Sequence, residues 1–268
     1  MYMEKVKINT KTHHTEKDNF YPKLVIKNNE NPNKLYAFPF VGLLIKAIML
    51  FPASLFLMFV AIAFFALWLI TPFVVLFTGK YWDPAYKMTL GFMIYRTKYS
   101  LFLLGLTDKY PGLDLETHGL FEITFKKPTA VGRWLAFPIA GFAIRLFLSI
   151  PYYIYSSVLD SGTYVAMVAS WFGILNKGKY PESLYEFNRD SIRVSLAYTV
   201  YLTYLSDRYP SFWISMKHKT VKITLIIIGA ILFILSNRSN NHRPHEMDRQ
   251  MPAGQHAPTN FPFKPSDY

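Results

Sequence analysis

The stretch from Val41 to Phe77 contains a single charged residue, Lys46. An α-helix crosses the hydrocarbon core of a bilayer with about 20 apolar residues, and this stretch is far longer. A soluble domain has no interior that could hide such a run. The chain of 268 residues is 51% hydrophobic, whereas residues 1–35 and 237–268 are polar. The sequence therefore predicts an all-α integral membrane protein with a polar extension at each end.

The sequence repeats itself with a period of 99 residues. Residues 36–111 align without a gap with residues 135–210, and 18 of the 76 aligned positions are identical. Internal similarity of this kind indicates a duplicated structural unit. Two short motifs mark each copy, Gly-Lys-Tyr and Asp-basic-Tyr-Pro. They comprise Gly79, Lys80, Tyr81, Asp108, Tyr110 and Pro111 in the first copy and Gly178, Lys179, Tyr180, Asp207, Tyr209 and Pro210 in the second.

The first half of each unit predicts a long helix. A short apolar segment with one cation comes first, at residues 37–50 and 136–149. We expect the long helix to begin at the proline that follows, Pro52 or Pro151, because the first helical position tolerates a missing N–H. At about 25 residues, this helix would be long enough to cross a bilayer with some tilt.

The second half of each unit is predicted to bring the chain back across the membrane. Gly79 and Gly178 are typical C-terminal caps for the long helices. A second helix is expected over about residues 84–107 and 181–206, and the proline of the second motif ends it. Each unit is therefore predicted to be a helical hairpin that enters and leaves the membrane on one side.

Two crossings in each unit would give both hairpins the same orientation, so the sequence predicts two tandem parallel hairpin repeats. The apolar run from Thr220 to Leu235 predicts a fifth crossing, a C-terminal transmembrane helix. Short strands are expected at the membrane surface, at Tyr21–Lys27 and residues 120–127. The predicted regions are the N-terminal arm (1–35), repeat 1 (36–111), a linker (112–134), repeat 2 (135–213), the fifth helix (214–236) and a disordered polar tail (237–268).

The charge of the chain points to a lipid partner. The formal net charge is +12, and the basic residues flank apolar segments, so anionic headgroups are expected rather than nucleic acid. More cations lie in the loops on the N-terminal side, which predicts a cytoplasmic N-terminus. The reverse orientation stays open, because further cations lie in the second helices toward the opposite side: Lys87, Arg96, Lys98, Arg189 and Arg193. The chain has no cysteine, and no pattern of catalytic, cofactor-binding or metal-ligating residues stands out. We expect neither a cofactor nor a metal.

Asp160 lies within an apolar run of the second unit, where the first unit has alanine. A charge at membrane depth is costly and commonly faces a partner or a water-filled cavity. A functional site would bind a proton or a cation there. The simpler interpretation, which we favour, is an ion pair with Arg189 or Arg193, or a helix break after Asp160. Together with Arg96, these residues form the candidate intramembrane polar site.

A carboxylate at the end of a helix is disfavoured by the helix dipole, and both units end their second helix with one. These are Asp108 and Asp207. The equivalent cations Lys46 and Arg145 are predicted at the same membrane face. We hypothesise that the two aspartates pair with these two cations, within or across units.

Each unit resembles the bacterial membrane-protein family called domain of unknown function 4389. The resemblance rests on the proline of the first helix, the glycine turn, arginines in the second helix and the closing aspartate-tyrosine-proline motif. The first unit offers Phe51-Pro52, Leu76-Phe77-Thr78-Gly79-Lys80-Tyr81, Arg96 and Thr107-Asp108-Lys109-Tyr110-Pro111; the second offers Ile150-Pro151, Gly178-Lys179-Tyr180-Pro181, Arg189, Arg193 and Asp207-Arg208-Tyr209-Pro210-Ser211-Phe212. Trp82 replaces a proline of the pattern, and Asn176-Lys177 replaces Phe-Thr.

The resemblance implies a multi-pass protein of the bacterial inner membrane but no activity. Three functions remain open. The first is a non-enzymatic scaffold or accessory subunit that binds another membrane protein or itself, which the absence of catalytic patterns favours. The second is a small transporter or channel, which a cavity lined by Asp160 and Arg193 would favour. The third, a lipid-modifying enzyme, has only the basic membrane interface in its favour.

Overall fold

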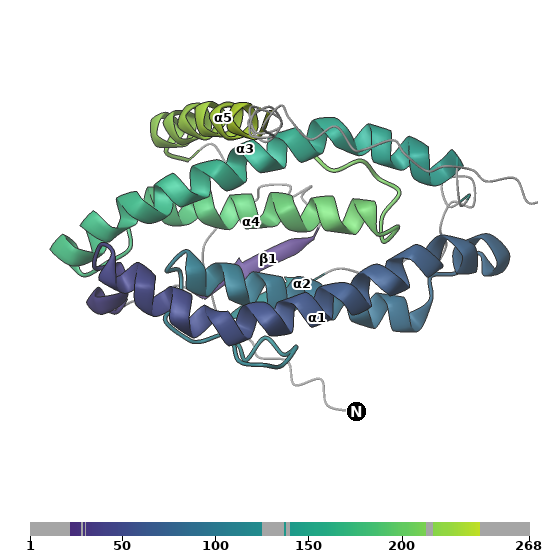
Figure 1. Cartoon of the computed structure of the whole chain (residues 1–268), viewed down its shortest axis with the longest axis horizontal. Coiled ribbons are helices and arrows are strands. Elements are labelled where there is room, and N and C mark those ends of the chain that lie inside the picture. Colours follow the sequence, from purple (N-terminus) through teal and green to yellow (C-terminus); the bar gives the residue numbers. More distant parts are fainter. Residues whose placement is uncertain are drawn as a thin grey trace, which may run out of the picture.

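The computed structural model describes residues 22–27, 29, 31–124, 137, 140–212 and 217–241. Helices dominate this part of the chain (Figure 1). A short 3₁₀ helix, η1, precedes the first of them, and two strands complete the described fold. The elements in chain order are β1 (Lys23–Ile26), η1 (Lys34–Ala37), α1 (Val41–Thr78), α2 (Asp83–Leu103), β2 (Phe121–Thr124), α3 (Ala140–Lys177), α4 (Glu182–Leu202) and α5 (Lys219–Asn241).

Within the described residues, three helices are long and apolar enough to cross a membrane: α1, α3 and α5. The predicted helical fold and the additional helix near the C-terminus are thus confirmed. α2 and α4, with 21 residues each, are long enough but do not belong to this group, because several charged residues lie along them. Length and composition therefore support three candidate spans rather than the predicted five. α5 also continues to Asn241, into the region predicted as tail, and residues 242–268 lie outside the described residues.

The long helices begin earlier than predicted. α1 and α3 each have 38 residues, and residues 41–50 and 140–149 of the short apolar segments expected before them form their first turns. Pro52 and Pro151 therefore lie inside a helix, not at its start. A proline removes one backbone hydrogen bond, but apolar helices tolerate it where their neighbours satisfy the freed carbonyl. The helix ends are as expected, since Gly79 and Gly178 adopt left-handed φ angles of 68° and 64°.

The two helix pairs, α1–α2 and α3–α4, lie antiparallel to each other. α1 and α3 run in opposite directions along the long axis in Figure 1. The indole N–H of Trp68, in the last third of α1, donates to the carbonyl of Leu202, at the end of α4, over 3.0 Å. Hairpins of one orientation would instead place the end of α1 beside the start of α4. The predicted parallel arrangement is therefore wrong.

The prediction assumed that the connection between the hairpins stays at one end of the molecule. Residues 104–139 separate α2 from α3. At up to about 3.3 Å per residue, they can easily cover the length of α3, which is about 57 Å at 1.5 Å per residue. The connection is thus long enough to run from one end of the helices to the other, and the second hairpin can enter from the opposite end.

The expected short strands form and pair. β1 and β2 are antiparallel, with Lys23 opposite Thr124 and Ile26 opposite Phe121. The side chains of Leu24 and Phe121 are buried in the main core, beside residues of α2 and α4 such as Leu101. This two-stranded sheet joins the N-terminal segment to the connection between the hairpins.

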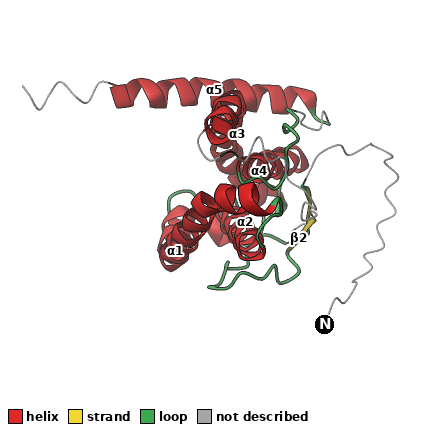
Figure 2. Ribbon diagram, turned by 90° about the vertical axis from the view of Figure 1, so that its right-hand side faces the viewer, coloured by secondary structure: helices red, strands yellow, loops and turns green. Residues whose placement is uncertain are grey.

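The helices and the sheet form layers. In Figure 2 these layers follow one another from left to right: α1 and α3 come first, α2 and α4 lie next to them, and the strands lie on the right. α5 is seen from the side while the other helices are seen along their axes, so it crosses them. The crossing is close, because a Cβ atom on Gly229 would lie 2.4 Å from the carbonyl oxygen of Val158. Glycine is therefore required where α5 passes over α3.

Candidate functional site

The carbonyl groups that end α2 and α4 are bound by the cation of the same hairpin. Lys46 donates to the carbonyl of Leu103 over 3.4 Å. Arg145 donates to the carbonyls of Tyr201 and Ser206. The last carbonyls of a helix have no partner within it and carry partial negative charge, so a buried cation is stabilising there. This explains why two charged side chains occur in the apolar first turns of α1 and α3.

The hypothesis that these cations pair with the motif aspartates holds in the second unit. Arg145 and Asp207 form an ion pair of 2.6 Å. In the first unit, Asp108 instead accepts hydrogen bonds from the side chain of Asn29 (2.9 Å) and the backbone N–H of Asn33 (2.7 Å). The N-terminal segment therefore supplies the donors that an arginine supplies in the other unit. Sequence could not reveal this exchange because the asparagines lie outside the repeat.

The tyrosine of the second motif packs beside each cation. Tyr110 meets the ring of Phe102 edge-on at 6.1 Å, and Tyr209 meets the ring of Tyr201 at 5.4 Å. Lys46 lies 5.8 Å from the centre of the Phe102 ring, and the guanidinium of Arg145 lies 4.8 Å from that of Tyr201. The same group of cation, aromatic ring and tyrosine thus recurs once in each unit.

The tyrosine of the first motif reaches across to the other hairpin. The hydroxyl of Tyr81 donates to the carbonyl of Thr203 over 2.9 Å, and that of Tyr180 donates to the carbonyl of Leu104 over 3.3 Å. Both donors and both acceptors are 99 residues apart, so the two contacts are equivalent. Each Gly-Lys-Tyr turn therefore caps the second helix of the other unit. These helices end at Leu103 and Leu202, earlier than the predicted ends at about residues 107 and 206, so the Asp-basic-Tyr-Pro motif follows the helix and does not end it.

A cavity of about 260 Å³ lies between the two hairpins. Asp160 from α3 and Arg96 from α2 both line it, and Ser191 donates to the Asp160 carboxylate over 3.3 Å. The positive charge of Arg96 acts on the Asp160 carboxylate across this cavity. The other lining residues are Leu57, Thr97, Tyr99, Ser100, Leu103, Leu104, Thr163, Tyr164, Ile192, Ser195 and Leu196.

The predicted partners of Asp160 bind a different carboxylate. Arg189 and Arg193 contact Asp190 at 3.0 and 3.7 Å, so the expected pairs with Asp160 do not form. Both arginines share α4 with Asp190, one residue before it and three after it, whereas Asp160 belongs to another helix. α3 also continues through Asp160 without the predicted break. Of the four predicted polar-site residues, the cavity unites Asp160 and Arg96.

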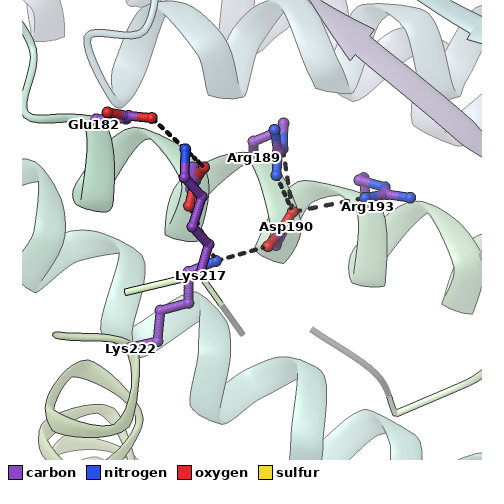
Figure 3. Close-up of polar contacts among 7 residues, drawn as sticks. Glu182, Arg189, Asp190, Arg193, Lys217 and Lys222 are labelled. Atoms are coloured by element: carbon purple, nitrogen blue, oxygen red, sulfur yellow. Dashed lines mark hydrogen bonds and ion pairs between the residues drawn. The ribbon is translucent and has the colours of Figure 1, made fainter. Parts of the chain in front are cut away.

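Asp190 is the centre of a charged network that sequence reasoning missed (Figure 3). Lys222 of α5 contacts it at 3.1 Å and also contacts Glu186 at 3.6 Å. Lys217 binds both Glu182 and Glu186. The signal was the spacing of the carboxylates, at every fourth position of α4, which puts them on one helix face. This face binds the basic start of α5.

Glu182, Glu186 and His218 lie close enough together to hold a metal ion. The ammonium group of Lys217 already contacts both carboxylates, at 3.2 Å in the case of Glu186. A resident cation would compete directly with a metal for the same oxygen atoms. The arrangement is accounted for by the ion pairs that join α4 to α5.

The tandem motifs and the paired helices agree with the comparison with known protein families. The family model described as Domain of unknown function (DUF4389) matches residues 41–112 and residues 140–214. These two segments cover more than half of the chain. No curated protein and no solved structure matches the sequence. The chain therefore belongs to the DUF4389 family and carries two copies of its domain.

Proposed function

We propose that the protein is a non-enzymatic scaffold or accessory subunit of a membrane assembly. The observation that carries the proposal is the reciprocal bonding of Tyr81 and Tyr180, which joins the two hairpins into one body. A transporter must move its parts between two arrangements, and here that movement would break buried hydrogen bonds. A body that is fixed internally and apolar outside suits a supporting role.

Photo-crosslinking in native membranes tests this proposal. A photoreactive amino acid at Val25, which is exposed on β1, should give a discrete protein adduct. The neighbouring buried position Leu24 is the matched control and should give none. The absence of a protein adduct at Val25 would reject a scaffold role.

The cavity between the hairpins favours a second function, a small transporter or channel. It contains opposite charges on α2 and α3, where the transport hypothesis requires polar groups. Proton, potassium and chloride flux into liposomes containing the purified protein would test it. Transport would be favoured if the protein carries a flux that is lost in Asp160→Asn and retained in the control Glu182→Gln. A flux no faster than in empty liposomes would exclude transport.

We also propose the bacterial inner membrane as the location, with the N-terminus in the cytoplasm and anionic headgroups as the lipid partner. The family resemblance supports the membrane, and the net charge of +12 supports the lipid. A reporter fused to the N-terminus should be protected from protease in intact cells and digested in inside-out vesicles.

A further inference from the structure

The connection between the hairpins constrains how the molecule can sit in a membrane. Because the hairpins are antiparallel, this connection begins at one end of the four helices and finishes at the other. It carries the carboxylates Asp114, Glu116 and Glu122. If α1 to α4 stood along the bilayer normal, these charges would have to be carried across the hydrocarbon core, which is very unfavourable.

The two-stranded sheet imposes a second constraint. It lies beside α4, where the hydroxyl of Tyr185 donates to the carbonyl of Ile26 over 3.1 Å, and β1 lies about midway along the helices in Figure 1. A two-stranded sheet has open edges with unpaired backbone groups, and such edges do not occur in hydrocarbon. Upright helices would bring these edges to the middle of the bilayer. The side of the molecule that carries the sheet must therefore face water.

The opposite side is apolar over its whole length. α1 has 38 residues and is about 57 Å long, almost twice the roughly 30 Å of the hydrocarbon core. Its exposed apolar side chains extend from the first turn to the last, and α3 adds more beside it. The exposed apolar residues of α1 and α3 include Leu44, Ile48, Phe51, Phe59, Phe65, Phe73, Phe77, Phe147, Ile154, Val168 and Phe172.

α5 is directed from the sheet side toward this apolar side. Its start is held at α4 by the contact of Lys222 with Asp190, and it then passes α3 at Gly229. Figure 2 shows it continuing beyond α3, on the side away from the strands. Its exposed apolar residues Ile227, Ile231 and Leu235 follow one another along the helix beyond its charged start.

From the polar sheet side, the opposite apolar side and the course of α5, we infer that the body formed by α1 to α4 lies in the plane of the membrane. α1 and α3 are embedded in the hydrocarbon of one leaflet, α2, α4 and the sheet face the aqueous side, and α5 alone crosses the bilayer. The partner of the apolar face is thus one lipid leaflet. The inference goes beyond the proposed function, and it stands whether or not the protein is a scaffold.

Spin-label depth measurements test this orientation. The chain has no cysteine, so single cysteines can be introduced at the exposed positions Leu44, Phe59 and Phe73 of α1. The protein is reconstituted into vesicles of phosphatidylethanolamine and phosphatidylglycerol, and collision of the label with oxygen and with a nickel chelate gives its depth. In-plane seating predicts similar depth at all three sites. A label at Phe59 much deeper than labels at Leu44 and Phe73 would overturn it.

α5 supplies the matched control, since cysteines at Ile223, Ile227, Ile231 and Leu235 should report changing depth along a crossing helix. A second measurement uses a membrane-impermeant thiol reagent on sealed native vesicles. Cysteines at the exposed residues Lys80 and Lys109, at opposite ends of the first hairpin, should react from the same side. Reaction of these two sites from opposite sides would equally reject the inference.

Discussion

Tyr81 and Tyr180 show how one side chain joins two parts of a chain. Each hydroxyl satisfies a carbonyl at the end of a helix in the other hairpin. A buried carbonyl without a partner costs free energy, so these two bonds favour one relative position of the hairpins over others. The tyrosine of the Gly-Lys-Tyr motif thus stabilises a helix end of the other copy and not of its own.

We expect Tyr81→Phe to lower the free energy of unfolding by about 1–3 kcal/mol, because the carbonyl of Thr203 would stay buried without its donor. Tyr180→Phe should cost at least as much, since the Tyr180 hydroxyl also accepts a hydrogen bond from Asn188. Thermal unfolding in detergent micelles would measure both. Tyr153→Phe, at an exposed tyrosine of α3, is the control and should change little; equal stability of all three variants would contradict the assigned role.

Asp114 gives the stability of the first hairpin a dependence on pH. Partial burial opposes its ionised form, but hydrogen bonds from His118, the backbone of Glu116 and Lys98 outweigh this and hold the pKa of Asp114 well below its usual value. Lys98, which is itself buried, lies 3.0 Å from the carboxylate. A lowered pKa stabilises the folded state above the ordinary aspartate pKa of about 4, and this contribution is lost as the pH falls toward the folded pKa.

Unfolding measured between pH 7 and pH 3 should therefore show a loss of stability in the acid range. Asp114→Asn should be less stable than the parent at pH 7, and the difference should shrink as the pH decreases. Glu122→Gln, at an exposed position of β2, should leave the profile of the parent unchanged. A difference between Asp114→Asn and the parent that stays constant with pH would exclude this ionic contribution.

At the scale of elements, sequence predicted the helices well and their limits less well. The long apolar stretches and the glycine caps located the ends of α1 and α3 near Gly79 and Gly178. Their beginnings were misplaced because Pro52 and Pro151 are ordinary start signals in water but are tolerated inside an apolar helix. The strands were found because alternating residues around Phe121 differ from the helical pattern. The sequence also located Asp160 and Arg96, but their shared cavity depends on how the hairpins meet.

The crossing of α3 and α5 depends on the small size of one residue. We expect Gly229→Ala to lower the free energy of unfolding by about 1–3 kcal/mol, since a Cβ atom would meet the backbone at Val158 and Gly162 and push the helices apart. Ile231→Val, at an exposed position of the same helix, is the control. Unfolding of both variants in micelles gives the comparison, and parent-like stability of Gly229→Ala would show that the helices are less tightly packed than described.

At the scale of the whole molecule, the orientation of the hairpins could not be derived from the repeat. Two equivalent units can associate in either direction, and only contacts between them distinguish the two. The prediction counted membrane crossings and took the linker to be local. The contact of Trp68 with Leu202 shows the opposite arrangement, and no pattern within either copy encodes it.

Distances between spin labels in cysteine pairs should distinguish the two arrangements. Labels at Lys80 and Lys179, at the turns of the two hairpins, should lie on the order of 50 Å apart, because the turns are at opposite ends of helices about 57 Å long. Labels at Lys80 and Arg208 should be much closer, since Tyr81 contacts Thr203. A short distance between Lys80 and Lys179 would restore the parallel arrangement.

The length of the connection between α2 and α3 also decides whether the two hairpins of one chain can pack on each other. It must bridge about 57 Å, which takes at least about 17 extended residues. With fewer residues, the first hairpin could still dock on a second hairpin, but only on one that belongs to another chain. Shortening residues 104–139 below that length is therefore expected to replace the contacts between the two hairpins of one chain by the same contacts between two chains, as in an exchanged dimer.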